Sequence, residues 1–223
     1  MRQGRPLAAL LPFEAAAWLW EAITLGAFAL TLRIVAPRPG FLRAMGILAF
    51  PIAWSLALGQ AQVVVTWLTA LASPFAVALA GQLKLFPALV AVYFLGIRDW
   101  RWLRRFAGWS LALIVVQVLL EPRGVVDFLA VTNLEQVGQI NNLSVYAVSP
   151  LLWAATSGVV AVVTLRLAPT RYGWLAASTF AVVTTPRLLA YLLMAILAGL
   201  RRPPGEAGAT PSRPGGAVGA PLP

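Results

Sequence analysis

The sequence predicts an all-α fold, a polytopic transmembrane helical bundle. Of its 223 residues, 60% are hydrophobic and only 11% are charged, and the mean hydropathy is +0.82. Soluble domains carry about 25% charged residues, whereas chains in lipid need long apolar runs. Segments rich in arginine, proline or glycine separate the apolar runs. We therefore expect about nine helical segments, some of which cross only part of the membrane.

The composition excludes several classes of chemistry. The chain has no cysteine and no histidine, which excludes disulfides, thiolate or imidazole metal sites and histidine-assisted nucleophiles. A net charge of +10 could indicate nucleic-acid binding, but the sixteen arginines lie between apolar runs, as membrane anchors do. We therefore expect no nucleic-acid partner. Arginine excess with abundant alanine, glycine and proline is typical of a bacterial gene rich in G and C, so we expect a protein of the bacterial inner (plasma) membrane.

Proline, glycine and arginine mark the boundaries of the expected segments. Residues 1–202 are expected to form one transmembrane domain, with a polar outer loop at residues 121–148. Residues 203–223 are rich in proline and glycine and are expected to form a disordered cytoplasmic tail. The expected helical segments are residues 12–35, 44–58, 61–72, 75–83, 88–97, 106–120, 149–165, 174–183 and 188–200.

The arginines predict the orientation. Four connections are rich in arginine and should be cytoplasmic by the positive-inside rule: residues 33–43, 98–105, 166–171 and 201–202. This requires residues 59–97 to cross three times and residues 174–200 to leave and return. Gln60, Lys84, the loop at 121–148 and Arg187 then share the outer face. The pieces involved are too short to span alone, so we expect half-depth helices that line a cavity.

Lys84 and Arg187 are the candidate anion-binding residues. Lys84 is the only lysine, and it interrupts an apolar stretch where a charge costs about 2.5–3.5 kcal/mol on insertion scales. Such a charge normally faces a cavity or an anionic partner, although a lysine can also anchor a helix end by snorkelling. Arg187, beside the second outer hinge, could bind the same anion with two hydrogen bonds or could be an interface anchor.

The outer loop offers the other candidates. Asn141 and Asn142 can donate to and accept from the hydroxyls of a ligand, or can form the turn before the next helix. Glu135 is a candidate general base, and the alternative is a solvated loop acid. Gln60 could contact a ligand or cap a helix end. We expect no metal and no cofactor, because the outer face lacks a dense carboxylate cluster and Lys84 with Arg187 could neutralise an anion.

Six segments in this order resemble the glycosyltransferase 87 family of the GT-C superfamily. They are PLAALLPFEAAAWLW, the pair GQ, LKLFPALVAVYFL, RDWRWLRRF, NNLSVYAVSP and TTPRLLAYLL. The resemblance covers about residues 6–200. It implies a bacterial membrane transferase that uses polyprenyl-phosphate sugars, and a helix pair with lysine at its outer tip recurs in such enzymes. The resemblance implies that the anion bound by Lys84, as a point charge, and by Arg187 is the lipid-linked phosphate of the donor. It also implies candidates for sugar or acceptor binding, which are Gln60, Asn141, Asn142 and, in the last segment, Tyr191.

The resemblance implies transfer of a hexose, with mannose as the first candidate, from a polyprenyl-phosphate sugar to a glycolipid or glycan on the outer face. Family members are about twice as long, and their N-terminal half carries the acidic loop with the expected base. We therefore expect this chain to match the C-terminal portion, with a separate N-terminal half as a candidate partner.

Two other functions are compatible with the sequence. A catalytically inactive truncated homologue could act as a membrane lipid-binding or scaffold protein, which the missing acidic loop favours. A small transporter would also have broken helices, but the sequence shows no internal repeat. Membrane lipids are expected partners in every case.

Overall fold

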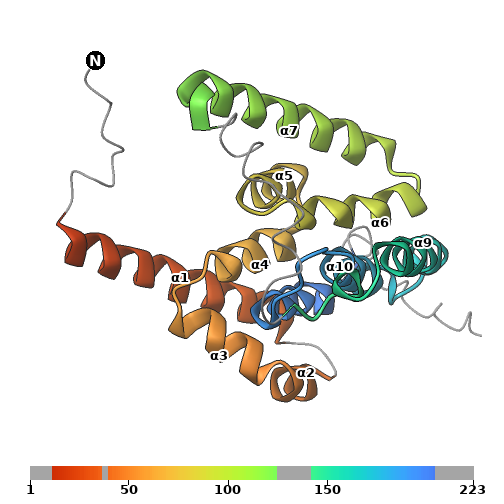
Figure 1. Cartoon of the computed structure of the whole chain (residues 1–223), viewed down its shortest axis with the longest axis horizontal. Coiled ribbons are helices and arrows are strands. Elements are labelled where there is room, and N and C mark those ends of the chain that lie inside the picture. Colours follow the sequence, from red (N-terminus) through yellow and green to blue (C-terminus); the bar gives the residue numbers. More distant parts are fainter. Residues whose placement is uncertain (1–11, 37–39, 125–141, 204–223) are drawn as a thin grey trace, which may run out of the picture.

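The computed structural model describes residues 12–36, 40–124 and 142–203, and within them all regular structure is helical (Figure 1). This confirms the predicted all-α class. Residues 125–141 of the expected outer loop and 204–223 of the expected tail lie outside the described residues. In chain order the elements are α1 (Phe13–Val35), α2 (Phe41–Ile47), α3 (Ala49–Ala57), α4 (Gln62–Leu71), α5 (Pro74–Leu83), the 3₁₀ helix η2 (Phe86–Val90), α6 (Ala91–Gly96), α7 (Trp100–Leu120), the 3₁₀ helix η4 (Val145–Ala147), α9 (Pro150–Leu167), α10 (Gly173–Val183) and the 3₁₀ helix η5 (Ala190–Leu200).

Within the described ranges, three helices are long and apolar enough to cross a membrane: α1, α7 and α9. The pair formed by α3 and α4 passes the same test together, but it is bent by 120°. The long helices bury few side chains within the protein. In α7 only Trp102 is buried, and in α9 only Thr164. Their exposed apolar surface suits contact with lipid, and the chain is a multi-pass membrane protein.

The largest differences from the expected boundaries are found at two places. The expected segment at residues 44–58 is divided into α2 and α3, with Leu48 between them. Helix α7 begins at Trp100 rather than at residue 106, because the carboxylate of Asp99 accepts a hydrogen bond from the Trp102 amide at 3.0 Å. A side-chain cap of this kind satisfies one of the free amides at a helix start, and here it extends the helix through the arginine-rich segment.

The three short helical segments expected between residues 59 and 97 are present as α4, α5 and the pair η2 and α6, while their three crossings of the membrane stay a prediction. Ser73 lies in the connection between α4 and α5 and caps α5, since its hydroxyl accepts from the Ala76 amide at 3.2 Å. Pro74 occupies the first position of that helix. In Figure 1, α4 and α5 lie between α7 at the top and α2 and α3 at the bottom. Each ten-residue helix is only about 15 Å long.

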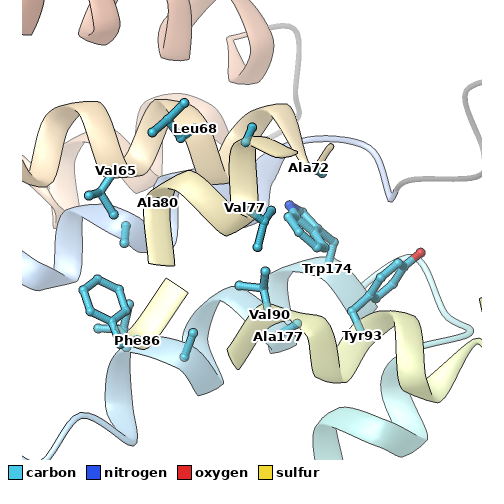
Figure 2. Packing of buried hydrophobic residues seen from close by; sticks show 14 of the residues in the cluster. Val65, Leu68, Ala72, Val77, Ala80, Phe86, Val90, Tyr93, Trp174 and Ala177 are labelled. Carbon is cyan, nitrogen blue, oxygen red and sulfur yellow. The ribbon is translucent and has the colours of Figure 1, made fainter. Parts of the chain in front are cut away.

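The main core is formed by the short helices. Buried side chains of α4 and α5 pack against those of η2, α6 and α10 (Figure 2). Trp174 is fully buried, and its indole N–H donates to the Ala198 carbonyl at 2.9 Å. A Cβ at Gly199 would lie 2.9 Å from the Cα of Leu175, so α10 and η5 approach closely. Small residues at such contacts compensate for the weak hydrophobic drive between helices in lipid.

The two ends of α4 meet different parts of the chain. At its C-terminal end, Arg201 donates to the carbonyls of Ala70 and Leu71, and Trp102 donates to that of Ala72 at 3.0 Å. At its N-terminal end, Gln62 meets Lys84. The elements expected on the cytoplasmic face and those expected on the outer face are therefore separated along α4, while the direction of the chain across the membrane stays a prediction.

Candidate functional site

A cavity of about 940 Å³ lies beside Lys84. It is bounded by the end of α5, the second half of α7, the hinge after α10 and the start of η5. Among the described residues its lining is mostly apolar and includes two cations but no carboxylate. The lining residues are Gly81, Gln82, Leu83, Lys84, Leu85, Phe86, Ile114, Gln117, Val118, Thr185, Arg187, Leu189, Tyr191 and Leu192.

Lys84 is held by two contacts. Its backbone ends α5, where its amide donates to the Ala80 carbonyl. Its Nζ donates to Oε1 of Gln62 at 3.2 Å and lies 4.5 Å from the centre of the Tyr191 ring. An ammonium has three N–H donors, and within the described part of the chain only one of them has a hydrogen-bond partner. The other two are available to a ligand in the cavity.

The charge of Lys84 is sensitive to its surroundings. The residue lies in the connection between α5 and η2, outside the candidate membrane spans. Burial lowers the pKa of its ammonium from 10.5 to about 8, because a low-dielectric environment disfavours the charged form. A negative ligand would favour the charged form again. Lys84 is therefore more fully protonated with an anion bound than without one.

Gln62 is a site residue that the sequence did not single out. It is the first residue of α4 and is fully buried. Its Nε2 donates to the Thr66 hydroxyl at 3.4 Å, and that hydroxyl donates to the Gln62 carbonyl at 2.8 Å. Gln62, Thr66 and Thr69 recur at spacings of four and three, so they form a polar stripe on one face of an apolar helix. This polar stripe is the sequence feature that could have indicated Gln62 as a site residue.

Arg187 lines the same cavity and is exposed. Within the described residues its side chain makes no hydrogen bond and no ion pair. Its backbone is fixed from both sides by Asn142, whose Nδ2 donates to the Pro186 carbonyl and whose Oδ1 accepts from the Leu188 amide, both at 2.9 Å. The hinge is also tied to α9, since the indole of Trp153 donates to the Thr184 carbonyl at 3.1 Å.

The other predicted site residues have different positions. Tyr191 lines the cavity together with Lys84 and Arg187, whereas Gln60 and Asn142 are not among its lining residues. Asn142 also accepts from the Ser144 amide at 2.9 Å, which is a turn contact. Gln60 precedes α4, but no side chain caps that helix. Asn141 and Glu135 lie outside the described residues. Sugar binding by Gln60, Asn141, Asn142 and Tyr191 and catalysis by Glu135 stay predictions.

The electrostatics of the cavity favour an anion. Lys84 and Arg187 give its described lining two positive charges with no acidic side chain to balance them. No group of three potential metal-ligating His, Cys, Asp or Glu residues occurs in the described ranges. Lysine acts on phosphate as a point charge and arginine as a two-pronged donor, so the pair suits a phosphate group.

A multi-pass membrane protein with a cationic cavity among short helices is the class that this fold and site define. The family model for glycosyltransferase family 87 matches residues 5–210, so the chain belongs to that family. Membership indicates a membrane glycosyltransferase with a sugar donor and an acceptor as substrates. Comparisons with curated proteins and with solved structures gave no match.

Proposed function

We propose that the chain binds a polyprenyl-phosphate sugar through Lys84 and Arg187 and takes part in transfer of its hexose to an acceptor. One observation carries this proposal. Among the described residues, two cations line an otherwise mostly apolar cavity that has no acidic side chain in its lining. Such a cavity suits a ligand that combines a phosphate with a hydrocarbon chain. Mannose as the sugar, a glycolipid or glycan as the acceptor and the outer face of a bacterial inner membrane complete the proposal.

The position of the cavity supports a lipid-linked donor rather than a water-soluble one. Helix α7 is a candidate membrane span, and it contributes Ile114 and Val118 to the cavity. Both side chains are also exposed on the protein surface. A ligand there would be close to the lipid phase, where an isoprenoid chain gains free energy by leaving water.

The two cations have a defined role in the proposed reaction. The acceptor hydroxyl attacks the anomeric carbon, and the bond from that carbon to the phosphate oxygen breaks. The electron pair goes to the leaving polyprenyl phosphate, and the acceptor proton goes to a base. Lys84 and Arg187 stabilise the leaving phosphate as its charge grows, which is electrostatic stabilisation of the transition state. Glu135 remains the proposed base.

A lipid-binding or scaffold protein without turnover is the second candidate. It is favoured by the absence of a carboxylate from the described lining of the cavity. General-base catalysis needs a base within about 3 Å of the proton that it removes, or one bridging water. The same cavity would bind a lipid phosphate in either case, so the two functions differ in turnover and not in binding.

The experiment measures sugar transfer from polyprenyl-phosphate-mannose in membranes that contain the chain. The comparison is between the wild type, Lys84→Ala and Lys84→Arg. We expect Lys84→Ala to lower kcat/KM about 100-fold, since a charge-assisted contact is lost, and Lys84→Arg to keep part of the activity. Equal transfer by the wild type and Lys84→Ala would contradict the phosphate clamp. Binding of the donor without any transfer would favour the scaffold function.

A further inference from the structure

We infer that Gln62 is a positioning residue that holds the Lys84 ammonium at the cavity, and that Thr66 fixes the orientation of its amide. This inference rests on the proposed function, because it concerns how the same cation meets a lipid-linked phosphate. It concerns a residue on α4 that does not line the cavity.

The contacts around Gln62 have a single arrangement. Its Oε1 accepts from the Lys84 ammonium at 3.2 Å, while its Nε2 donates to the Thr66 hydroxyl at 3.4 Å. Thr66 uses its own hydrogen to bond the Gln62 carbonyl at 2.8 Å, so its oxygen is left to accept. If the amide were reversed, its NH₂ group would face the ammonium, and two donors would meet. Thr66 therefore selects the orientation in which the oxygen faces Lys84.

Burial makes this contact specific. Gln62 and Thr66 are both fully buried, so neither can exchange its partner for water. A buried polar group without a partner costs free energy, and this cost keeps the network closed. Lys84 carries a flexible stem of four carbons, which could otherwise turn its charge out of the cavity. The buried amide limits that freedom and leaves two N–H donors for a phosphate.

The chain offers a matched pair of variants for the test. Thr66 and Thr69 are both buried on α4, and each hydroxyl donates to the carbonyl four residues earlier at 2.8 Å. Only Thr66 also bonds the Gln62 side chain. Thr66→Val and Thr69→Val therefore remove the same group from the same helix, and they differ in the contact to Gln62.

The experiment measures binding of farnesyl phosphate, a short isoprenoid phosphate, to the full chain in lipid nanodiscs. We expect Gln62→Leu to weaken binding about tenfold and Thr66→Val about threefold, whereas Thr69→Val binds like the wild type. A double-mutant cycle gives the readout that a purely structural role would not change. If Gln62 acts through Lys84, adding Gln62→Leu to Lys84→Met costs nothing further.

Each outcome separates this inference from the proposed function. Weak binding by Lys84→Met together with wild-type binding by Gln62→Leu would overturn the role of Gln62 and keep the phosphate site. Lys84→Met equal to the wild type would overturn both. An undiminished cost of Gln62→Leu in the Lys84→Met background would also overturn the positioning role. If Gln62→Leu fails to fold, the test is the comparison of ligand binding by Thr66→Val with that by Thr69→Val. Equal binding by those two variants would overturn the inference.

Discussion

Two cations lie at the two ends of α4, and their surroundings differ. Arg201 meets the C-terminal end, where its guanidinium donates to the carbonyls of Ala70 and Leu71. The last carbonyls of a helix have no partner within it, so Arg201 fills a structural need. Lys84 meets the N-terminal end through one side-chain oxygen and faces a cavity. The comparison separates a cation used for the fold from one available for a ligand.

The largest expected effect is loss of ligand stabilisation in Lys84→Met. A ligand that binds only the folded protein raises its melting temperature according to concentration and affinity. Farnesyl phosphate should therefore raise the Tm of the wild type, and about 100-fold weaker binding should remove most of that rise. Without ligand the variant should melt near the wild-type temperature, because removing a charge whose burial is unfavourable offsets the loss of the contact to the buried Gln62 amide. The measurement is thermal unfolding in detergent with and without farnesyl phosphate.

The converse is expected for Arg201→Met. Loss of its bonds to two helix carbonyls should cost about 2 kcal/mol, which is about 4–8 °C in Tm for a chain of this size. Binding of farnesyl phosphate should not change, since Arg201 lies at the far end of α4. Thermal unfolding and a binding titration on the same sample provide the check. A variant that lost binding but kept its stability would reverse the assignment of the two ends.

A pH effect distinguishes lysine from arginine at position 84. The lowered pKa of Lys84, about 8, means that its ammonium loses its proton as the pH rises through that value. Above pH 8 we expect binding of farnesyl phosphate to weaken up to tenfold per pH unit. Lys84→Arg keeps its charge, so its binding should stay constant.

The titration should run from pH 7.5 to 9.5, where the ligand phosphate is already fully ionised, since its second pKa is about 6. Arg187 and Tyr191 are the other ionisable side chains in the described lining of the cavity, and both remain in Lys84→Arg. A parallel decline in the wild type and in Lys84→Arg would exclude Lys84 as the titrating group.

The smallest expected effect is that of Trp174→Phe. The substitution keeps most of the buried ring but removes the hydrogen bond to the Ala198 carbonyl. The net cost of one such bond is about 1 kcal/mol, which corresponds to about 2–4 °C in Tm. Ligand binding should be unchanged, because Trp174 lies in the core and not in the cavity. Thermal unfolding of Trp174→Phe and Arg201→Met under the same conditions would compare the contributions of the two contacts to stability.

Sequence reasoning found the cations because a charge in an apolar run is costly wherever the chain folds. The breaks at Ser73 and Pro74 and around Lys84 are local signals, and the three short helical segments between residues 59 and 97 follow from them. Gln62 was not predicted, because its role depends on a contact with Lys84, 22 residues further along the chain. Gln60 lies two residues earlier in the same uncharged segment, and the sequence alone does not distinguish the two glutamines. Asn142 carries a local turn signal, but its bonds to the hinge at Arg187 join segments 44 and 46 residues apart.

The missed start of α7 has a different cause, which is local. The start of α7 depends on one capping contact of Asp99, which an apolar window cannot detect. The membrane character of α1, α7 and α9 needed only length and hydropathy. Length and hydropathy of single segments were therefore predictable, and charge placed Lys84 and Arg187 at one site. Individual side-chain contacts, such as the cap by Asp99 and the bond from Lys84 to Gln62, were not predictable.

Discrimination between farnesyl phosphate and farnesol tests the central claim most directly. The two ligands share the isoprenoid chain and differ in the phosphate, so their ratio of Kd values reports the anion site alone. In nanodiscs of neutral lipid at pH 7.5 we expect the wild type to prefer farnesyl phosphate by about 100-fold and Lys84→Met to lose most of this preference. Equal affinity of the wild type for both ligands, or an unchanged preference in Lys84→Met, would contradict the assignment of Lys84 to a lipid-linked phosphate.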